Sequence, residues 1–176
     1  MPVIYCDMSY EANADIQKEK AAFFAKYPRC PESSPIGVFN LIMRRDMAEQ
    51  ILKGEKKVEF RAYSKHFCDR LFDNRVEQFA SQIAEEDFED YEDFAKPLRV
   101  VKTIHFHNYN NTWHLDVECI DNGVVTPCNE DAEMLESLYQ DTELKAMTEE
   151  MNKKKTRQRP MYFYFALGDI IDTNLK

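Results

Sequence analysis

Glycine is scarce in this chain, with 4 residues among 176, so long flexible linkers are not expected. The first residues have no basic segment followed by an apolar one, which argues against a secretory signal. The apolar run of residues 162–167 is far short of the roughly 20 residues that cross a membrane. The sequence therefore predicts a cytoplasmic protein without a membrane partner.

Cysteine is present, but its spacing matches no disulfide or metal-binding pattern. The five cysteines are an odd number and include no CxxC pair, which favours reduced thiols over a disulfide framework or a zinc site. They are Cys6, Cys30, Cys68, Cys119 and Cys128. Burial as free thiols is the simplest interpretation, and it agrees with a cytoplasmic location.

Charge is distributed unevenly along the chain. The net charge of −9 argues against sequence-independent binding to nucleic acid. Residues 37–70 carry +3 and residues 151–176 carry +4, whereas residues 71–150 carry −15. If the two basic segments meet in space, they form a local positive site on a negative body.

The spacing of apolar residues predicts an α+β fold. We expect helices over residues 10–27, 47–53, 75–95 and 129–151, and strands over residues 38–43, 57–61, 98–107, 112–120 and 161–167. Prolines at positions 28, 31 and 35 interrupt the chain. Residues 1–36 are therefore predicted to be an N-terminal extension, and residues 37–176 the main domain.

Residues typical of helix ends refine these boundaries. Asp46 is expected to cap a helix in a capping box with Glu49. Gly54 is expected to end that helix in a left-handed conformation. Asn129 is the expected cap of the last helix, and Gly168 is expected to end the last strand.

Residues 54–61 hold the densest group of chemically useful side chains. In the strand expected there, Val58 and Phe60 share the buried face, so Glu59 and Arg61 share the other, which faces a groove or solvent. Lys56 lies at the bend before the strand and can turn toward Glu59. Without further information, the simplest interpretation is an ordinary ion pair beside two solvated lysines, Lys56 and Lys57.

The same side chains also suit ligand recognition. Arg61 offers a planar fork for phosphate or a base edge, and Glu59 can accept hydrogen bonds from an exocyclic amine. Lys56 can contact phosphate, or act as a base in a desolvated site.

The pattern Gly54-x-Lys56-x-x-Glu59-x-Arg61, directly after a helix, resembles the signature of the ASCH domain family in the PUA-like superfamily. The strand around Leu41, residues 69–71 and residues 162–165 add to the likeness. The resemblance covers about residues 37–172. It implies a small β-barrel with flanking helices and a cleft in which the motif residues lie.

The resemblance further implies a module that binds RNA or a modified nucleotide, with no cofactor expected. The ligand-binding residues that we expect are Gly54, Lys56, Lys57, Glu59, Arg61, Lys154 and Arg157. The alternative is a hydrolase, either an amidohydrolase on an acylated nucleoside or a ribonuclease, with Lys56 and Glu59 as catalytic residues. The amidohydrolase pattern has a threonine where Glu59 stands and a distant glutamate, for which Glu136 and Glu143 are candidates.

Two charged segments offer further hypotheses. Residues 153–159 are basic, and are either a solvated loop or a phosphate-contacting border of the cleft that Arg44 and Arg45 extend. The expected helix 75–95 carries a strongly acidic stretch over residues 85–93, which is a solvated face or, as a third possible function, a protein-docking surface.

Histidines and aromatic residues complete the candidates. In a hairpin that places Phe106 opposite Trp113, His105 lies opposite His114, with His107 and Asp116 nearby. These four could bind a metal, but no ligand-spacing signature supports one, so a polar strand face is the preferred interpretation. Trp113, Tyr162 and Tyr164 could stack on a base, although most barrel aromatics belong to the core.

Overall fold

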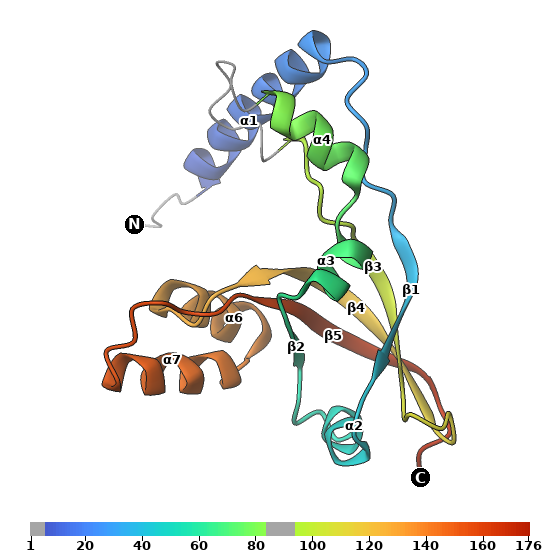
Figure 1. The fold of residues 1–176 in the computed structure, drawn as a ribbon. Coiled ribbons are helices and arrows are strands. Elements are labelled where there is room, and N and C mark those ends of the chain that lie inside the picture. The colour runs from blue at the N-terminus through green and yellow to red at the C-terminus, as the bar shows by residue number, and fades with distance from the viewer. Residues whose placement is uncertain (1–5, 84–93) are drawn as a thin grey trace. The chain divides into compact units, whose positions relative to one another are not determined.

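The computed structural model describes residues 6–83 and 94–176, and its fold is mixed α+β, as predicted (Figure 1). The chain forms two compact units. The first unit combines Met1–Ser33 with Phe72–Leu98, and the second combines Ser34–Leu71 with Arg99–Lys176. No helix in the described ranges has the length and apolar character needed to cross a membrane.

The first unit is built around two helices, α1 (Cys6–Lys26) and α4 (Asn74–Ile83). Phe23 of α1 is fully buried with Val76, Ile83 and Ala95. This packing confirms a helix close to residues 10–27 and the beginning of the helix expected over 75–95. The acidic residues 85–93 lie outside the described ranges.

The second unit contains a five-stranded sheet in the order β1-β3-β4-β5-β2. The strands are β1 (Ile36–Ile42), β2 (Val58–Ala62), β3 (Val101–His107), β4 (His114–Val125) and β5 (Tyr162–Thr173). β1 pairs with β3 in parallel, and the other neighbours are antiparallel. The sheet curls into half a barrel (Figure 1).

Alternation along the strands determines which face of the sheet is buried. Ile104 and Phe106 of β3, Leu115 of β4 and the preceding Trp113 are all buried, as the sequence predicts. The helices α6 (Asn129–Tyr139) and α7 (Glu143–Lys153) pack Leu135 and Leu144 against the other end of the sheet.

The helix predicted over residues 129–151 is in fact these two helices. Gln140 ends α6 in a left-handed conformation, with φ of 58°. The buried Asp141 carboxylate then accepts the backbone N–H of Leu144, which starts α7. The break lets two short helices pack side by side. The residue that precedes α6 as its cap is Cys128, not Asn129 as predicted.

Helix α2 (Arg45–Leu52) is confirmed, but its predicted capping box is wrong. The capping position belongs to Arg44, and no side chain caps the helix. Asp46 instead accepts hydrogen bonds from the Arg44 guanidinium, and Glu49 pairs with Arg45. Gly54 has φ of 73°, which confirms the left-handed exit from the helix.

The last strand continues through Gly168 instead of ending there. A Cβ atom at this position would lie 2.8 Å from Ile120 and 2.9 Å from Glu118, so glycine allows close approach of β4 and β5. Irregular register in β4 between Asp116 and Asp121 accommodates the longer pairing. Helix α3 (Lys65–Leu71) follows β2 and completes this unit.

Candidate functional site

Lys56, Glu59, Arg61 and Glu143 form a partly buried ionic cluster in the second unit. The Lys56 ammonium lies 3.4 Å from a Glu59 carboxylate oxygen and donates a 3.0 Å hydrogen bond to Glu143. The Arg61 guanidinium donates a 2.9 Å hydrogen bond to the other Glu59 oxygen. The predicted convergence of Lys56, Glu59 and Arg61 is therefore observed, and Glu143 joins it from α7.

The turn after α2 positions the lysine. The backbone N–H groups of Glu55 and Lys56 both donate to the Gln50 carbonyl, at 2.9 and 3.2 Å, which ties the turn to α2. Gly54 supplies the left-handed residue that this reversal needs. Lys56 thus enters the protein interior just before β2 begins.

Strand β2 positions the other two motif side chains. In the sheet order β2 lies beside β5, with Glu59 opposite Phe165 and Arg61 opposite Phe163. Arg61 also donates a 2.9 Å hydrogen bond to the Ile42 carbonyl at the end of β1. The sequence left open whether Glu59 faces a groove or solvent. In the structure Glu59 is buried between Lys56 and Arg61 and does not face solvent.

Burial raises the pKa of the Glu59 carboxyl above its ordinary value of 4.5, and the charges of Lys56 and Arg61 oppose this rise only in part. The folded chain therefore holds the Glu59 proton more tightly than the unfolded chain does. Below pH 4.5 its stabilising contribution is complete, and it is lost as the pH rises through the folded pKa.

Glu59→Gln should remove this dependence. The free energy of unfolding of the wild type, relative to that of Glu59→Gln, is expected to fall as the pH rises from about 4 to 7. Urea denaturation of both proteins across this range measures the difference. A difference that increases with pH would mean that the two ion pairs outweigh the desolvation of Glu59.

A pocket of about 420 Å³ opens beside this cluster. Its lining includes Met47 and Gln50 of α2, Lys56 and Lys57 of the motif, and Gln140 and Glu143 at the break between α6 and α7. Glu59 and Arg61 do not line it. Lys56 and Glu143 therefore connect the buried ion pairs to the pocket.

The pocket is polar without being basic. Its carboxylates, Glu55, Asp141 and Glu143, outnumber its lysines. Both lysines already donate within the protein. Lys56 donates to Glu143 at 3.0 Å, and Lys57 donates to the side-chain oxygen of Gln140 at 2.5 Å. Burial raises the pKa of Asp141. Such a lining suits a neutral hydrogen-bonding ligand better than a phosphate.

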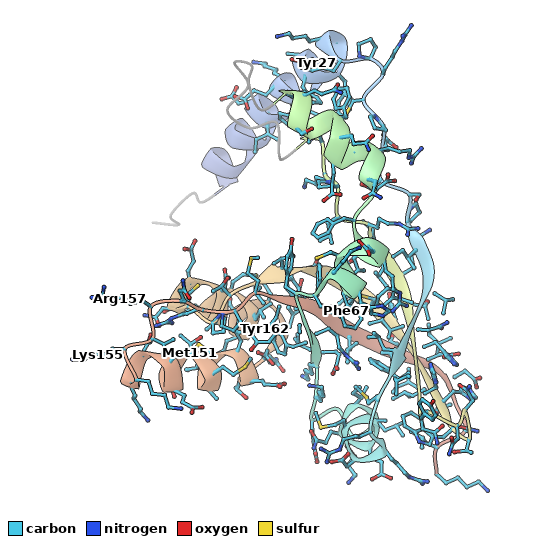
Figure 2. The ribbon with its side chains drawn as sticks, viewed as in Figure 1. Tyr27, Phe67, Met151, Lys155, Arg157 and Tyr162 are labelled. Carbon is cyan, nitrogen blue, oxygen red and sulfur yellow. The ribbon has the colours of Figure 1, made fainter. Side chains whose placement is uncertain are left out.

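The basic segments do not meet at this pocket. Residues 153–159 begin at the C-terminal end of α7, where Figure 2 labels Lys155 and Arg157. The 11 residues of α7 span about 16 Å from Glu143 to this end. There, Lys154 pairs with Glu150 at 2.6 Å, and Arg157 is exposed. Neither Lys154 nor Arg157 lines the pocket, and Arg44 and Arg45 are paired with acidic residues of α2.

The other candidates from the sequence have structural partners. Glu136 pairs with Lys145 rather than with Lys56. Trp113 and Tyr164 are buried, and Tyr162 is half-buried beside the core. The Tyr164 hydroxyl donates to Asp121 at 2.8 Å, and the Tyr139 hydroxyl donates to the same oxygen. Trp113 and Tyr164 therefore offer no open stacking surface.

The histidine hairpin has a different register from the predicted one. His107 lies opposite His114, and His105 lies opposite Asp116. The prediction was offset because Phe106 pairs with Leu115 rather than with Trp113. Asp172 of β5 also belongs to this group, because its carboxylate contacts His114. The prediction from sequence missed Asp172 because it ended the last strand at residue 167.

Scans against protein-family models, curated proteins and solved structures each found no match. The function of the pocket must therefore be inferred from its own geometry.

Proposed function

We propose that this protein is an ASCH-type module that binds a nucleobase, as part of a modified nucleoside or of single-stranded RNA, in the pocket beside Lys56. The observation that carries the proposal is the ionic cluster of Lys56, Glu59, Arg61 and Glu143, which opens into the pocket through Lys56 and Glu143. The likeness of residues 54–61 to the ASCH signature supports the same class of ligand.

Burial of the cluster is difficult to explain by stability alone. Lys56 and Glu59 have side chains exposed by only 6% and 9%. Removing charges from water costs free energy that their attraction often fails to offset, so buried ion pairs are weak evidence for stability. Buried charges beside a pocket are instead typical of functional sites.

The chemistry of the lining supports a base as the bound group. The half-exposed Glu143 carboxylate can accept from an exocyclic amine, and Lys56 can donate to a base carbonyl. The amides of Gln50 and Gln140 can do either. The volume of about 420 Å³ lies within the range of small-molecule sites.

A hydrolase is the second candidate, and the position of Glu143 favours it specifically. Glu143 is one of the two glutamates proposed for the distant position of the amidohydrolase pattern, and it lies 3.0 Å from Lys56. Glu59 stands in the threonine position of that pattern. An ammonium paired with two carboxylates is a hydrogen-bond donor rather than a nucleophile, so binding remains the leading function.

Glu143→Gln tests both candidates with little risk to the fold, since this side chain is 49% exposed. Calorimetric titration with cytidine, uridine, N4-acetylcytidine and short single-stranded RNA should show at least one saturable ligand for the wild type. We expect Glu143→Gln to bind it about tenfold more weakly, in line with the loss of one charged hydrogen bond. Affinity should change little between 50 and 200 mM salt, because a base-directed site neutralises few phosphates.

Glu136→Gln is the matched control, because Glu136 pairs with Lys145 in the same pair of helices. It should bind as the wild type does. Chromatography of the same mixtures detects deacetylated or cleaved products, which would establish the hydrolase if Glu143→Gln abolished them. Absence of binding and of products, or equal affinity of both variants, would contradict the proposal.

A further inference from the structure

A ladder of histidine and aspartate side chains crosses three neighbouring strands on the exposed face of the sheet. His107 lies opposite His114, and His105 lies opposite Asp116, on β3 and β4. Asp116 in turn lies opposite Asp172 on β5. The imidazoles stack, with ring centroids 5.4 Å apart for His105 and His107, and 5.8 Å for His105 and His114.

The two aspartates form an unfavourable pair as they stand. Like charges directly opposite each other on neighbouring strands destabilise a sheet. In the described part of the chain, the ion-pair partners of Asp116 and Asp172 are the imidazoles of His105 and His114, and no lysine or arginine pairs with either. A cation bound between the two carboxylates would relieve this repulsion.

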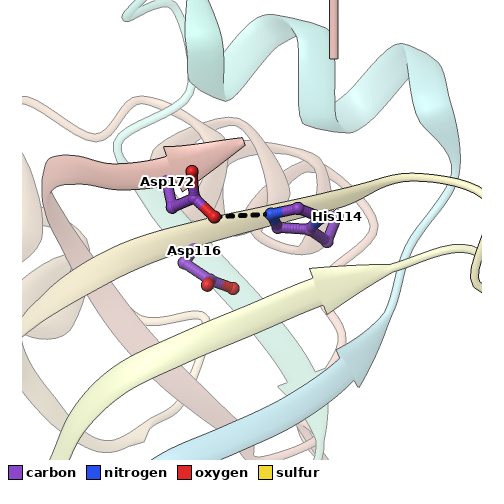
Figure 3. A group of neighbouring side chains, drawn as sticks. All are labelled: His114, Asp116 and Asp172. Atoms are coloured by element: carbon purple, nitrogen blue, oxygen red, sulfur yellow. Dashed lines mark hydrogen bonds and ion pairs between the residues drawn. The ribbon is translucent and has the colours of Figure 1, made fainter. Parts of the chain in front are cut away.

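The donor atoms are close enough to share one ion. One nitrogen of His114 and one carboxylate oxygen each of Asp116 and Asp172 all lie within 4.8 Å of one another (Figure 3). The His114 Nε2 atom is 2.9 Å from Asp172. Metal–donor distances of about 2.0–2.2 Å require donor separations of roughly 3–4 Å, so small side-chain rotations suffice.

We propose that His114, Asp116 and Asp172 bind one divalent transition-metal ion. One imidazole and two carboxylates are a donor set for Mn²⁺, Co²⁺ or Zn²⁺ rather than for a thiolate-seeking ion. Asp172 is 68% exposed, so water has access to the remaining coordination positions.

His105 acts as a positioning residue for this site. Its Nδ1 atom hydrogen-bonds the Asp116 carboxylate, which is the arrangement that orients a metal ligand from outside. His114 is fixed by its backbone, since its N–H donates to the Asn174 side chain at 2.8 Å and its carbonyl accepts from the Thr173 hydroxyl at 2.7 Å. Donors on paired strands hold their geometry better than donors on loops.

Titration of chelator-treated full-length protein with Co²⁺, Mn²⁺ and Zn²⁺, followed by calorimetry and by the cobalt absorption spectrum, tests the proposal. We expect one ion per chain. His114→Ala and Asp172→Asn should each weaken binding at least tenfold, and His105→Gln should weaken it about 10–100-fold. A cobalt spectrum without a thiolate charge-transfer band should exclude the free cysteines as ligands.

Two variants control for surface binding. Asp169→Asn alters another exposed carboxylate of β5, and His66→Ala removes an exposed imidazole of α3. Both should bind the metal as the wild type does, and circular dichroism checks that all variants are folded. The proposal is overturned if no ion binds saturably, or if binding survives both His114→Ala and Asp172→Asn. Nucleoside binding is measured separately, so the two proposals can fail independently.

Discussion

Lys56→Met is expected to lower the free energy of unfolding by about 3 kcal/mol at pH 7, because removing one partner of a buried ion pair leaves a buried charge without compensation. Glu59 would keep only Arg61 as a cationic partner in a site where its carboxylate is almost fully buried. Methionine preserves the length of the chain, so cavity formation contributes little. Urea denaturation monitored by circular dichroism measures the loss.

Lys145→Met is the control for Lys56→Met. Lys145 pairs with Glu136 as Lys56 pairs with Glu143, but both partners of that pair are more than a third exposed. Its removal should leave the free energy of unfolding nearly unchanged, because exposed ion pairs contribute little. The double variant Lys56→Met/Glu59→Gln should recover part of the loss. A loss below about 1 kcal/mol for Lys56→Met would contradict the idea that Glu59 is effectively desolvated.

The Lys56→Met defect should also depend on pH. Protonation neutralises Glu59, and the pKa of this carboxyl is already raised by burial in the wild type. Without Lys56 that pKa rises further, since one of the opposing charges is gone. The defect should therefore be smaller at pH 4 than at pH 7.

Asp121→Ala is expected to cost about 3 kcal/mol, because one carboxylate oxygen accepts hydrogen bonds from both Tyr139 and Tyr164, and bonds to a charged group contribute about 1.5–3 kcal/mol each. Tyr164 is buried, so its hydroxyl would lose its partner without access to water. Asp121→Asn retains an acceptor oxygen and should cost clearly less. Equal losses for the two variants would contradict this account.

An alkaline titration gives an independent measure of the same contact. Burial, with the hydrogen bond to Asp121 as a further cause, raises the pKa of Tyr139 from 10 to about 12, and burial raises that of Tyr164 as well. The stability associated with Tyr139 is complete below pH 10 and is lost as the pH rises toward 12. Asp121→Ala should shift tyrosinate absorbance to lower pH, and Tyr139→Phe should remove one late-titrating group.

The parts of the site that local sequence determines could be predicted. Gly54 follows a helix and takes the left-handed conformation, and Lys56 at the resulting bend turns toward Glu59. These outcomes depend on residues within one turn and one short strand. Side-chain alternation likewise identified the buried face of β3 and β4.

The parts that depend on distant pairing could not be predicted. Glu143 is 87 positions from Lys56, and it reaches the site only because Gln140 interrupts a continuous helical pattern with a left-handed residue. Asp172 joins the histidine ladder because irregular register in β4 lets β5 run past Gly168. Neither the helix break at Gln140 nor the irregular register of β4 has a clear pattern in the nearby sequence, because both depend on how helices and strands pack.

The position of β2 in the sheet has a consequence for protein synthesis. β2 is made early, yet the strand that it pairs with is β5. Lys56, just before β2, gains its partner Glu143 only when α7 has formed. A ribosome must therefore release more than a hundred further residues before Glu59 and Lys56 are enclosed. Until then Lys56 and Glu59 remain exposed to water and β2 has no strand partner. Unpaired strand edges promote aggregation and are bound by chaperones. Ligand binding at this pocket would accordingly report that α7 has been made and has packed beside Lys56.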